Sequence, residues 1–165
     1  MFFDVRLYRK TGGEYSVSDA TAVLCEGRPY AERIQKRILE MPRREGSPIR
    51  SIVFSLGFSK AVKDKIGAAR KLTPCDEEYA IVIDSVTRIY ATGERGFLYA
   101  VETLAALAEE RGGLCRGFLY DYPICEARGY RVYLPARAGF GAFFKMCHVN
   151  SRRHKSWLAV PERVF

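Results

Sequence analysis

Apolar and polar side chains alternate in several short segments of the chain, and a period of two is the pattern of a half-buried β-strand. The first strand is predicted over residues 2–8, with Gly12-Gly13 as its end. Further strands are predicted over residues 20–25 and residues 49–56, and the last of these is expected to be central in a sheet.

The hairpin pattern is the clearest in the chain. Two runs rich in β-branched and aromatic residues cover residues 79–83 and 86–90, and residues 84–85 alone separate them. A two-residue connection between such runs predicts a β-hairpin. A further strand is predicted over residues 114–120, and residues 121–123, Asp-Tyr-Pro, are expected to end it.

Apolar residues recur every three or four positions in two segments, the pattern of a helix with one buried face. One helix is predicted to begin at Pro29, with a face made of Tyr30, Ile34, Ile38 and Met41. The other is predicted over residues 96–111, with residues 112–113, Gly-Gly, as its C-terminal stop. Residues 57–75 are read equally well as a short helix or as a loop, because glycine and proline interrupt the helical spacing.

These elements predict an α+β fold: a mixed, mostly antiparallel sheet with two helices on one face, followed by an irregular C-terminal tail. A chain of 165 residues is long enough for one domain with its own core. We expect an α+β domain over residues 1–123. Residues 124–165 are expected to form a linker, one strand and a basic irregular tail.

The charge of the chain is concentrated near its C-terminus. The net charge is +8, and residues 137–165 carry 6 Lys or Arg against 1 Glu. Cationic segments with interspersed aromatic residues, here Phe143, Phe144 and Trp157, can bind single-stranded nucleic acid. Nucleic-acid binding is nevertheless disfavoured, because the rest of the chain is nearly balanced in charge.

Cysteine and histidine spacing argues against a metal site. The five cysteines are widely spaced without a CxxC pair, so free buried thiols in a reducing compartment are expected. His148 and His154 have only Cys147 nearby, and a solvated tail is expected there. No signal-peptide core or membrane span is visible, so the expected setting is cytoplasmic, without a membrane partner or cofactor.

The adjacent acids do not form a catalytic pair. Glu77-Glu78 and Glu109-Glu110 each point to different faces of their element, so neither pair can flank a glycosidic bond, and both are expected to be solvated. The Gly93 to Gly96 segment precedes a helix but lacks the glycine fingerprint of a phosphate loop, so a plain N-cap is expected.

A family resemblance rests on about 50 residues. Residues 77–104 contain an E-x-Y strand opening, a hairpin and a helix reading G-x-x-Y-x-x-x-T-L, and residues 121–123 and Arg128-Gly129 continue the series. This arrangement resembles the N-terminal, non-catalytic domain of family-20 β-N-acetylhexosaminidases. Related domains also precede other glycosidase barrels, including those of α-glucuronidases.

The resemblance implies that this domain has a partner domain and that catalysis takes place in the partner. In the family, this domain packs against a (β/α)8 barrel, which supplies an Asp-Glu pair for substrate-assisted hydrolysis of the carbohydrate. Arg128 corresponds to a barrel arginine that binds a substrate hydroxyl, and no residue of this chain corresponds to a catalytic residue or a metal ligand.

The sequence departs from the family pattern after residue 138, where the charge and periodicity change abruptly. A truncated or frame-shifted product is one hypothesis for this change. The chain is therefore predicted to be a non-catalytic accessory domain of a β-N-acetylhexosaminidase-type glycoside hydrolase, inactive alone. The alternative is a stand-alone carbohydrate- or nucleic-acid-binding module that uses the basic tail.

Overall fold

The computed structural model describes residues 5–43, 46–70, 73, 75–111 and 113–123. By its contacts, the chain separates into two compact units, Met1–Tyr122 and Pro123–Phe165, and all elements below belong to the first. Arg128, both histidines and the basic tail lie outside the described residues.

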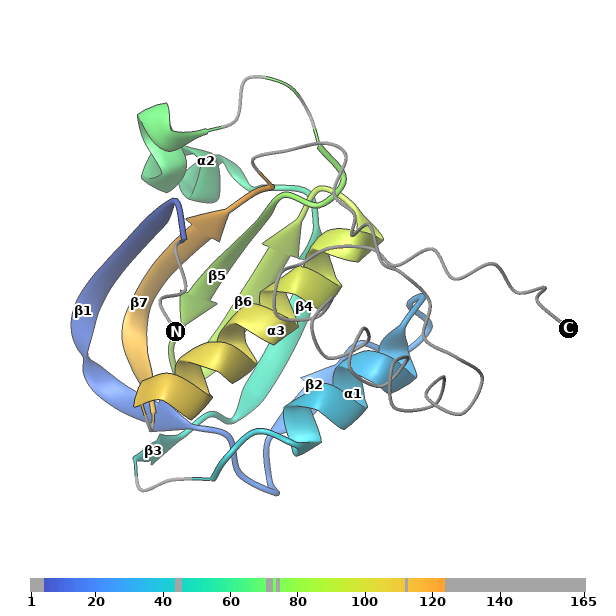
Figure 1. Ribbon diagram of the computed structural model, residues 1–165, viewed down its shortest axis with the longest axis vertical. Helices are drawn as coiled ribbons and strands as arrows, with labels where there is room; N and C mark the ends of the chain where they lie inside the picture. The colour runs from blue at the N-terminus through green and yellow to red at the C-terminus, as the bar shows by residue number, and fades with distance from the viewer. Residues whose placement is uncertain (1–4, 44–45, 71–72, 74, 112, 124–165) are drawn as a thin grey trace, which may run out of the picture. The chain divides into compact units, whose positions relative to one another are not determined.

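A seven-stranded mixed sheet forms the centre of this unit, in the order β2-β4-β6-β5-β7-β1-β3 (Figure 1). The strands are β1 Leu7–Ser16, β2 Ala22–Leu24, β3 Ser47–Pro48, β4 Ser51–Leu56, β5 Tyr79–Ile83, β6 Val86–Ala91 and β7 Leu114–Asp121. Strands β1, β7, β5 and β6 pair antiparallel in that order, whereas β6-β4, β4-β2 and β1-β3 are parallel. The predicted α+β class with a mixed sheet is confirmed, as are the hairpin and the strand at residues 114–120.

Two helices cover one face of the sheet, as expected. They are α1, Ala31–Leu39, and α3, Glu94–Arg111, which lie side by side, with α3 against β5, β6 and β7 (Figure 1). A third helix, α2, Lys60–Ile66, continues into a 3-10 turn and packs its apolar side with the opposite sheet face. The ambiguous segment 57–75 therefore contains a short helix.

Helix α3 is the centre of the core. Residues 96–101 are all buried, and because six successive residues span more than a full turn, this part of α3 is covered on all sides, whereas Glu109 and Glu110 near its end are exposed. The ring of Phe97 meets that of Phe54 edge-on, with centroids 5.5 Å apart. Among the described helices, none is long and apolar enough to cross a membrane.

Helix α1 begins later than its sequence predicts. Ile34, Ile38 and Met41 are buried, as expected, but Tyr30 is 41% exposed and adopts a left-handed conformation with φ of 70°. The left-handed turn at Tyr30 redirects the chain immediately before the helix, so the helix starts at Ala31 and not at Pro29.

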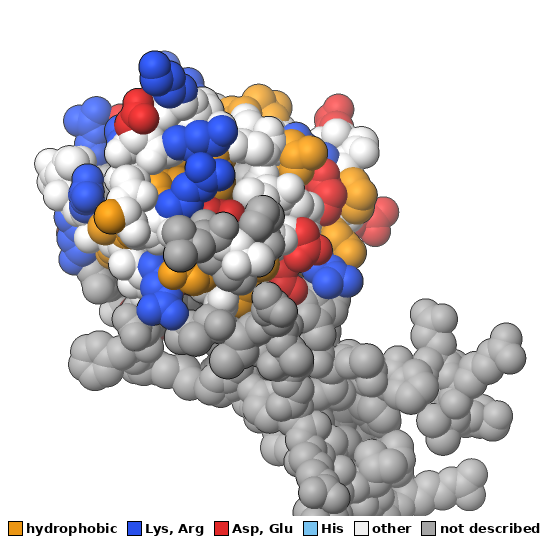
Figure 2. Space-filling model, turned by 90° about the horizontal axis from the view of Figure 1, so that it is seen from above, with side chains coloured by type: hydrophobic (Ala, Val, Ile, Leu, Met, Phe, Trp, Pro, Cys, Tyr) orange, Lys and Arg blue, Asp and Glu red, His pale blue; other side chains and the backbone are white. Residues whose placement is uncertain are grey.

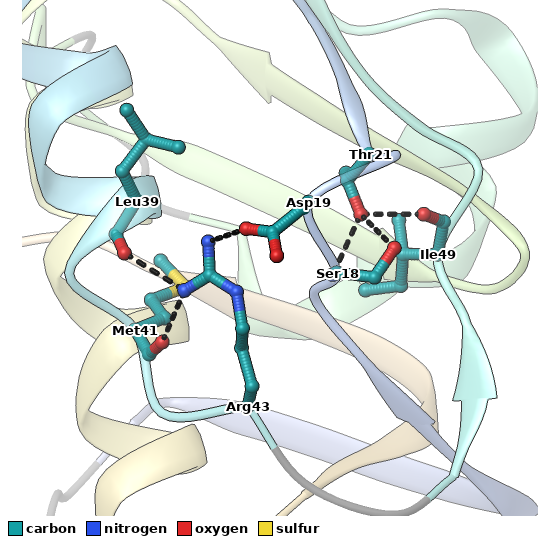
Figure 3. Close-up of polar contacts among 7 residues, drawn as sticks. All are labelled: Ser18, Asp19, Thr21, Leu39, Met41, Arg43 and Ile49. Atoms are coloured by element: carbon teal, nitrogen blue, oxygen red, sulfur yellow. Dashed lines mark hydrogen bonds and ion pairs between the residues drawn. The ribbon is translucent and has the colours of Figure 1, made fainter.

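Arg43 fixes the C-terminal end of α1 to the loop between β1 and β2 (Figure 3). Its guanidinium donates to the carbonyl of Leu39 at 3.0 Å and to Asp19 at 2.5 Å. Cations near the last carbonyls of a helix satisfy groups that the helix leaves unpaired. In the same loop, the Thr21 hydroxyl donates to the carbonyl of Ile49 at 2.7 Å, which ties the loop to the sheet.

The predicted first strand differs from β1: residues 2–4 lie outside the described residues, and residues 5–6 are not part of the strand. Strand β1 begins at Leu7 and continues through Gly12-Gly13, where its pairing with β7 shifts register between Lys10 and Glu14. Both glycines have positive φ, 93° and 76°, which extra residues in a β-bulge commonly require. The glycines therefore bend the strand and do not end it.

Candidate functional site

Polar side chains are buried where β5 begins and β7 ends. Glu78, Thr103 and Asp121 are 3%, 0% and 6% exposed, and two fully buried tyrosines, Tyr79 and Tyr120, lie among them. We call these five residues the polar joint. Buried polar groups must be hydrogen-bonded to be tolerated, so the partners of each side chain decide its role.

On the α3 face of the sheet, the polar joint links β5, β7 and α3. Tyr79 and Asp121 are directly opposite in the two strands. The Tyr79 hydroxyl donates to Asp121 Oδ2 at 3.0 Å and lies 2.6 Å from the Thr103 hydroxyl. Because the phenol has one hydrogen, Thr103 donates to Tyr79, and the three groups form a directed chain.

On the opposite face, Tyr120 and Glu78 form the second half of the polar joint. The Tyr120 hydroxyl donates to Glu78 Oε1 at 2.6 Å. Aromatic neighbours enclose the Tyr120 ring, with Phe58 and Tyr122 centroids 6.2 Å and 5.7 Å away. The prediction that Glu77-Glu78 is solvated is wrong: both acids are buried in the segment that leads into β5, and both faces of β5 are covered.

Burial raises the pKa of the Tyr79 phenol well above its ordinary value of 10, and the nearby charge of Asp121 adds to this. A raised pKa stabilises the folded protein below pH 10, and that stabilisation is lost as the pH rises toward the folded pKa. The free-energy gap between the natural protein and Tyr79→Phe should therefore shrink from about pH 9 to about pH 11. Urea unfolding at both pH values measures the gap, and a constant gap would contradict the prediction.

The polar joint cannot act as a glycosidase pair. Such a pair must face one sugar across roughly 5–10 Å of open space. Asp121 is bound to Tyr79 on the α3 face of the sheet, and Glu78 is bound to Tyr120 on the α2 face. These carboxylates therefore act as hydrogen-bond acceptors that fix strand ends.

Glycines let the start of α3 approach the polar joint closely. A Cβ atom on Gly96 would lie 2.7 Å from the Cβ of Ala91 and 2.9 Å from the Glu78 carbonyl. One on Gly93 would lie 2.5 Å from the carbonyl of Asp76. Gly93 and Gly96 are therefore required for close packing. The sequence predicts only an N-cap for this segment.

The other candidate residues are separate from the polar joint. Glu109 and Glu110 are exposed, as expected, although Glu109 pairs with Arg37 at 3.0 Å. Cys25 is a buried free thiol whose pKa burial raises, whereas Cys75 and Cys115 are free but partly exposed. Within the described ranges, no three His, Cys, Asp or Glu side chains are grouped as a metal site.

Three of the five residues of the polar joint belong to the sequence motifs described above. Tyr79, Gly96, Thr103 and Asp121 are letters of the quoted family motifs, and the structure brings all of them together. The sequence pattern predicts Tyr120 only as part of a strand and does not indicate its buried hydrogen bond. Its position beside the Asp-Tyr-Pro segment was the available indication.

Several solved structures share the fold of this chain. No protein-family model and no curated protein matches the chain in sequence. Among solved structures, the family-20 β-N-acetylhexosaminidase from Streptomyces coelicolor A3(2) is 17% identical with a TM-score of 0.52, over 75% of this chain. Streptomyces plicatus N-acetyl-β-hexosaminidase gives the same values, and CpGH84B gives a TM-score of 0.56 over 87% of this chain at 17% identity.

The match covers only part of each larger protein. This chain spans 26% of the length of each of these three proteins. At such identity the comparisons show the fold, and they confirm the predicted resemblance to one domain within larger hexosaminidase chains.

Proposed function

We propose that this chain is the accessory, non-catalytic domain of a β-N-acetylhexosaminidase-type glycoside hydrolase. Its partner is a (β/α)8 barrel that acts on N-acetylhexosamine-containing carbohydrates, and Arg128, outside the described residues, binds a substrate hydroxyl in that barrel. The observation that carries the proposal is the polar joint, in which Tyr79, Thr103 and Asp121 of the family motifs hold the end of β7.

The burial of α3 supports a packing role for the helical side of the domain. Residues 96–101 of α3 are buried around more than a full turn, and a helical segment that is apolar all round needs cover beyond a single sheet. Leu98 and Tyr99, 7% and 8% exposed, belong to this continuous buried surface. The buried helix gives the domain a rigid body, which suits a supporting role beside a neighbouring domain.

Co-purification of enzyme activity tests the proposal. An antibody raised against this chain is used to precipitate its antigen from an extract of the source cells. The precipitate should hydrolyse 4-nitrophenyl N-acetyl-β-D-glucosaminide and yield peptides of a (β/α)8 barrel by mass spectrometry, because the domain is held to that barrel. The purified 165-residue chain should show no turnover above buffer.

Antibody blocked with an excess of purified chain is the control, and it should recover no activity. A precipitate that contains the chain but neither barrel peptides nor activity would overturn the accessory role. Turnover by the purified chain itself would overturn the assignment as non-catalytic.

A further inference from the structure

An open groove of about 470 Å³ lies on the α2 side of the sheet. Its floor includes Val82 and Phe118, and Arg9, Lys65 and Arg116 are among its lining residues. The proposed function does not use this groove.

The register of the sheet places cations on both sides of the floor. Arg9 in β1 is opposite Phe118 in β7, Phe118 is opposite Val82 in β5, and Val82 is opposite Arg88 in β6. Residues directly opposite one another share a sheet face. Because neighbouring strands are about 4.8 Å apart, Arg9 and Arg88 flank the floor at about 14 Å.

Helix α2 adds a further cation, and this side of the molecule is basic. Lys65 Nζ lies 5.8 Å from the centroid of the Phe118 ring. Figure 2 shows most Lys and Arg side chains on the left of the view, the side of α2 and β1 in Figure 1, with acidic side chains mostly on the right. Within the described part of the chain, Arg9, Lys65 and Arg88 form no ion pair.

Arg116 is held in a fixed orientation at the groove. Its Nε and one terminal nitrogen donate to Asp84 Oδ2 at 3.0 Å and 2.7 Å, and the Tyr15 hydroxyl donates to Oδ1 at 2.9 Å. The backbone N–H of Ser85, together with Arg116 and Tyr15, lowers the pKa of Asp84. The one acid of the groove lining is thus engaged, and the guanidinium retains N–H groups for another acceptor.

We propose that this groove binds an anionic saccharide, a sugar chain that carries carboxylate or sulfate groups. Guanidinium groups recognise such planar or multi-oxygen anions through paired hydrogen bonds. The anionic character follows from Arg9, Lys65 and Arg116, which line the groove around one engaged acid, and from Arg88, which lies beside the floor opposite Val82. The saccharide class rests on the proposed function, since the parent enzymes act on carbohydrates.

The floor disfavours single-stranded nucleic acid as the occupant. Binding of that class relies on exposed aromatic faces on which bases stack. Phe118 is only 5% exposed, and Lys65 lies over its ring. The groove therefore offers charge and shape, but no stacking platform.

Binding of labelled probes to the full chain tests the proposal. The probes are a chondroitin sulfate hexasaccharide, neutral chitohexaose and a mixed-sequence single-stranded DNA 12-mer, each followed by fluorescence anisotropy. The sulfated probe should bind most tightly. Arg9→Ala with Lys65→Ala should weaken it about tenfold or more, because two charge-assisted contacts are lost.

The matched control is Arg33→Ala with Lys36→Ala, which removes the same charge from exposed positions of α1 on the other face. It should change binding less than about twofold. Equal weakening by both double variants would overturn the site, and so would absence of binding or equal binding of chitohexaose. If DNA bound more tightly than the sulfated probe, and Arg9 and Lys65 were needed for that binding, the occupant of the groove would be a nucleic acid and the saccharide proposal would be overturned. None of these outcomes changes whether hexosaminidase activity precipitates with the chain, so the two proposals fail independently.

Discussion

Replacing Phe97 by alanine is expected to lower the free energy of unfolding by about 3–5 kcal/mol. Phe97 is fully buried, packs edge-on against Phe54 and lies under the guanidinium of Arg28, 4.7 Å from the ring centroid. The truncation would leave a cavity between α3 and the sheet, which rigid neighbours fill only in part. Urea unfolding followed by far-ultraviolet circular dichroism measures the change.

Leu39→Ala in α1 serves as the control for this variant. Leu39 is 60% exposed, so its truncation should change the free energy of unfolding by less than about 0.5 kcal/mol. If the two variants were equally stable, the packing of α3 described above would be incorrect.

Replacing Tyr79 by phenylalanine is expected to destabilise the domain by about 1.5–3 kcal/mol, although only one oxygen atom is removed. Asp121, 6% exposed, would lose the hydroxyl donor 3.0 Å away, and a buried carboxylate is costly without its hydrogen bonds. The same urea unfolding experiment measures this effect.

Tyr30→Phe removes the same atom from a side chain that is 41% exposed, and its effect should stay within about 0.5 kcal/mol. Equal effects of Tyr79→Phe and Tyr30→Phe would show that the polar joint contributes nothing beyond an ordinary surface hydroxyl.

Elements that depend on near neighbours in the chain were predicted well. The β5-β6 hairpin needs only a short turn between two β-branched runs, and α3 needs only apolar residues at helical spacing. Both are present at the predicted residues, with ends shifted by at most two positions.

Features that depend on distant parts of the chain were not predictable in this way. The pairing of β7 with both β5 and β1 joins segments far apart in the sequence, and no local pattern specifies that order. The sequence predicts a strand end at Gly12-Gly13 where the structure has a bulge, because glycine pairs favour both. The sequence predicts a solvated Glu78, because its partner Tyr120 is brought to it only by the fold.

The same distinction applies to the functional features. The motif letters Tyr79, Thr103 and Asp121 pointed to a family domain, but their hydrogen-bonded chain emerges only when β5, β7 and α3 meet. The sequence does not predict that Arg9 and Arg88 lie on either side of one groove floor, because their placement depends on the register of four strands.

The position of β7 has a mechanical consequence. This strand lies inside the sheet, antiparallel to both β5 and β1, and Asp121 ends it just before Pro123. Tension applied at Pro123 along the axis of β7 would load two hydrogen-bond ladders in shear at once. We therefore expect the domain to be a stiff anchor that transmits force before it unravels.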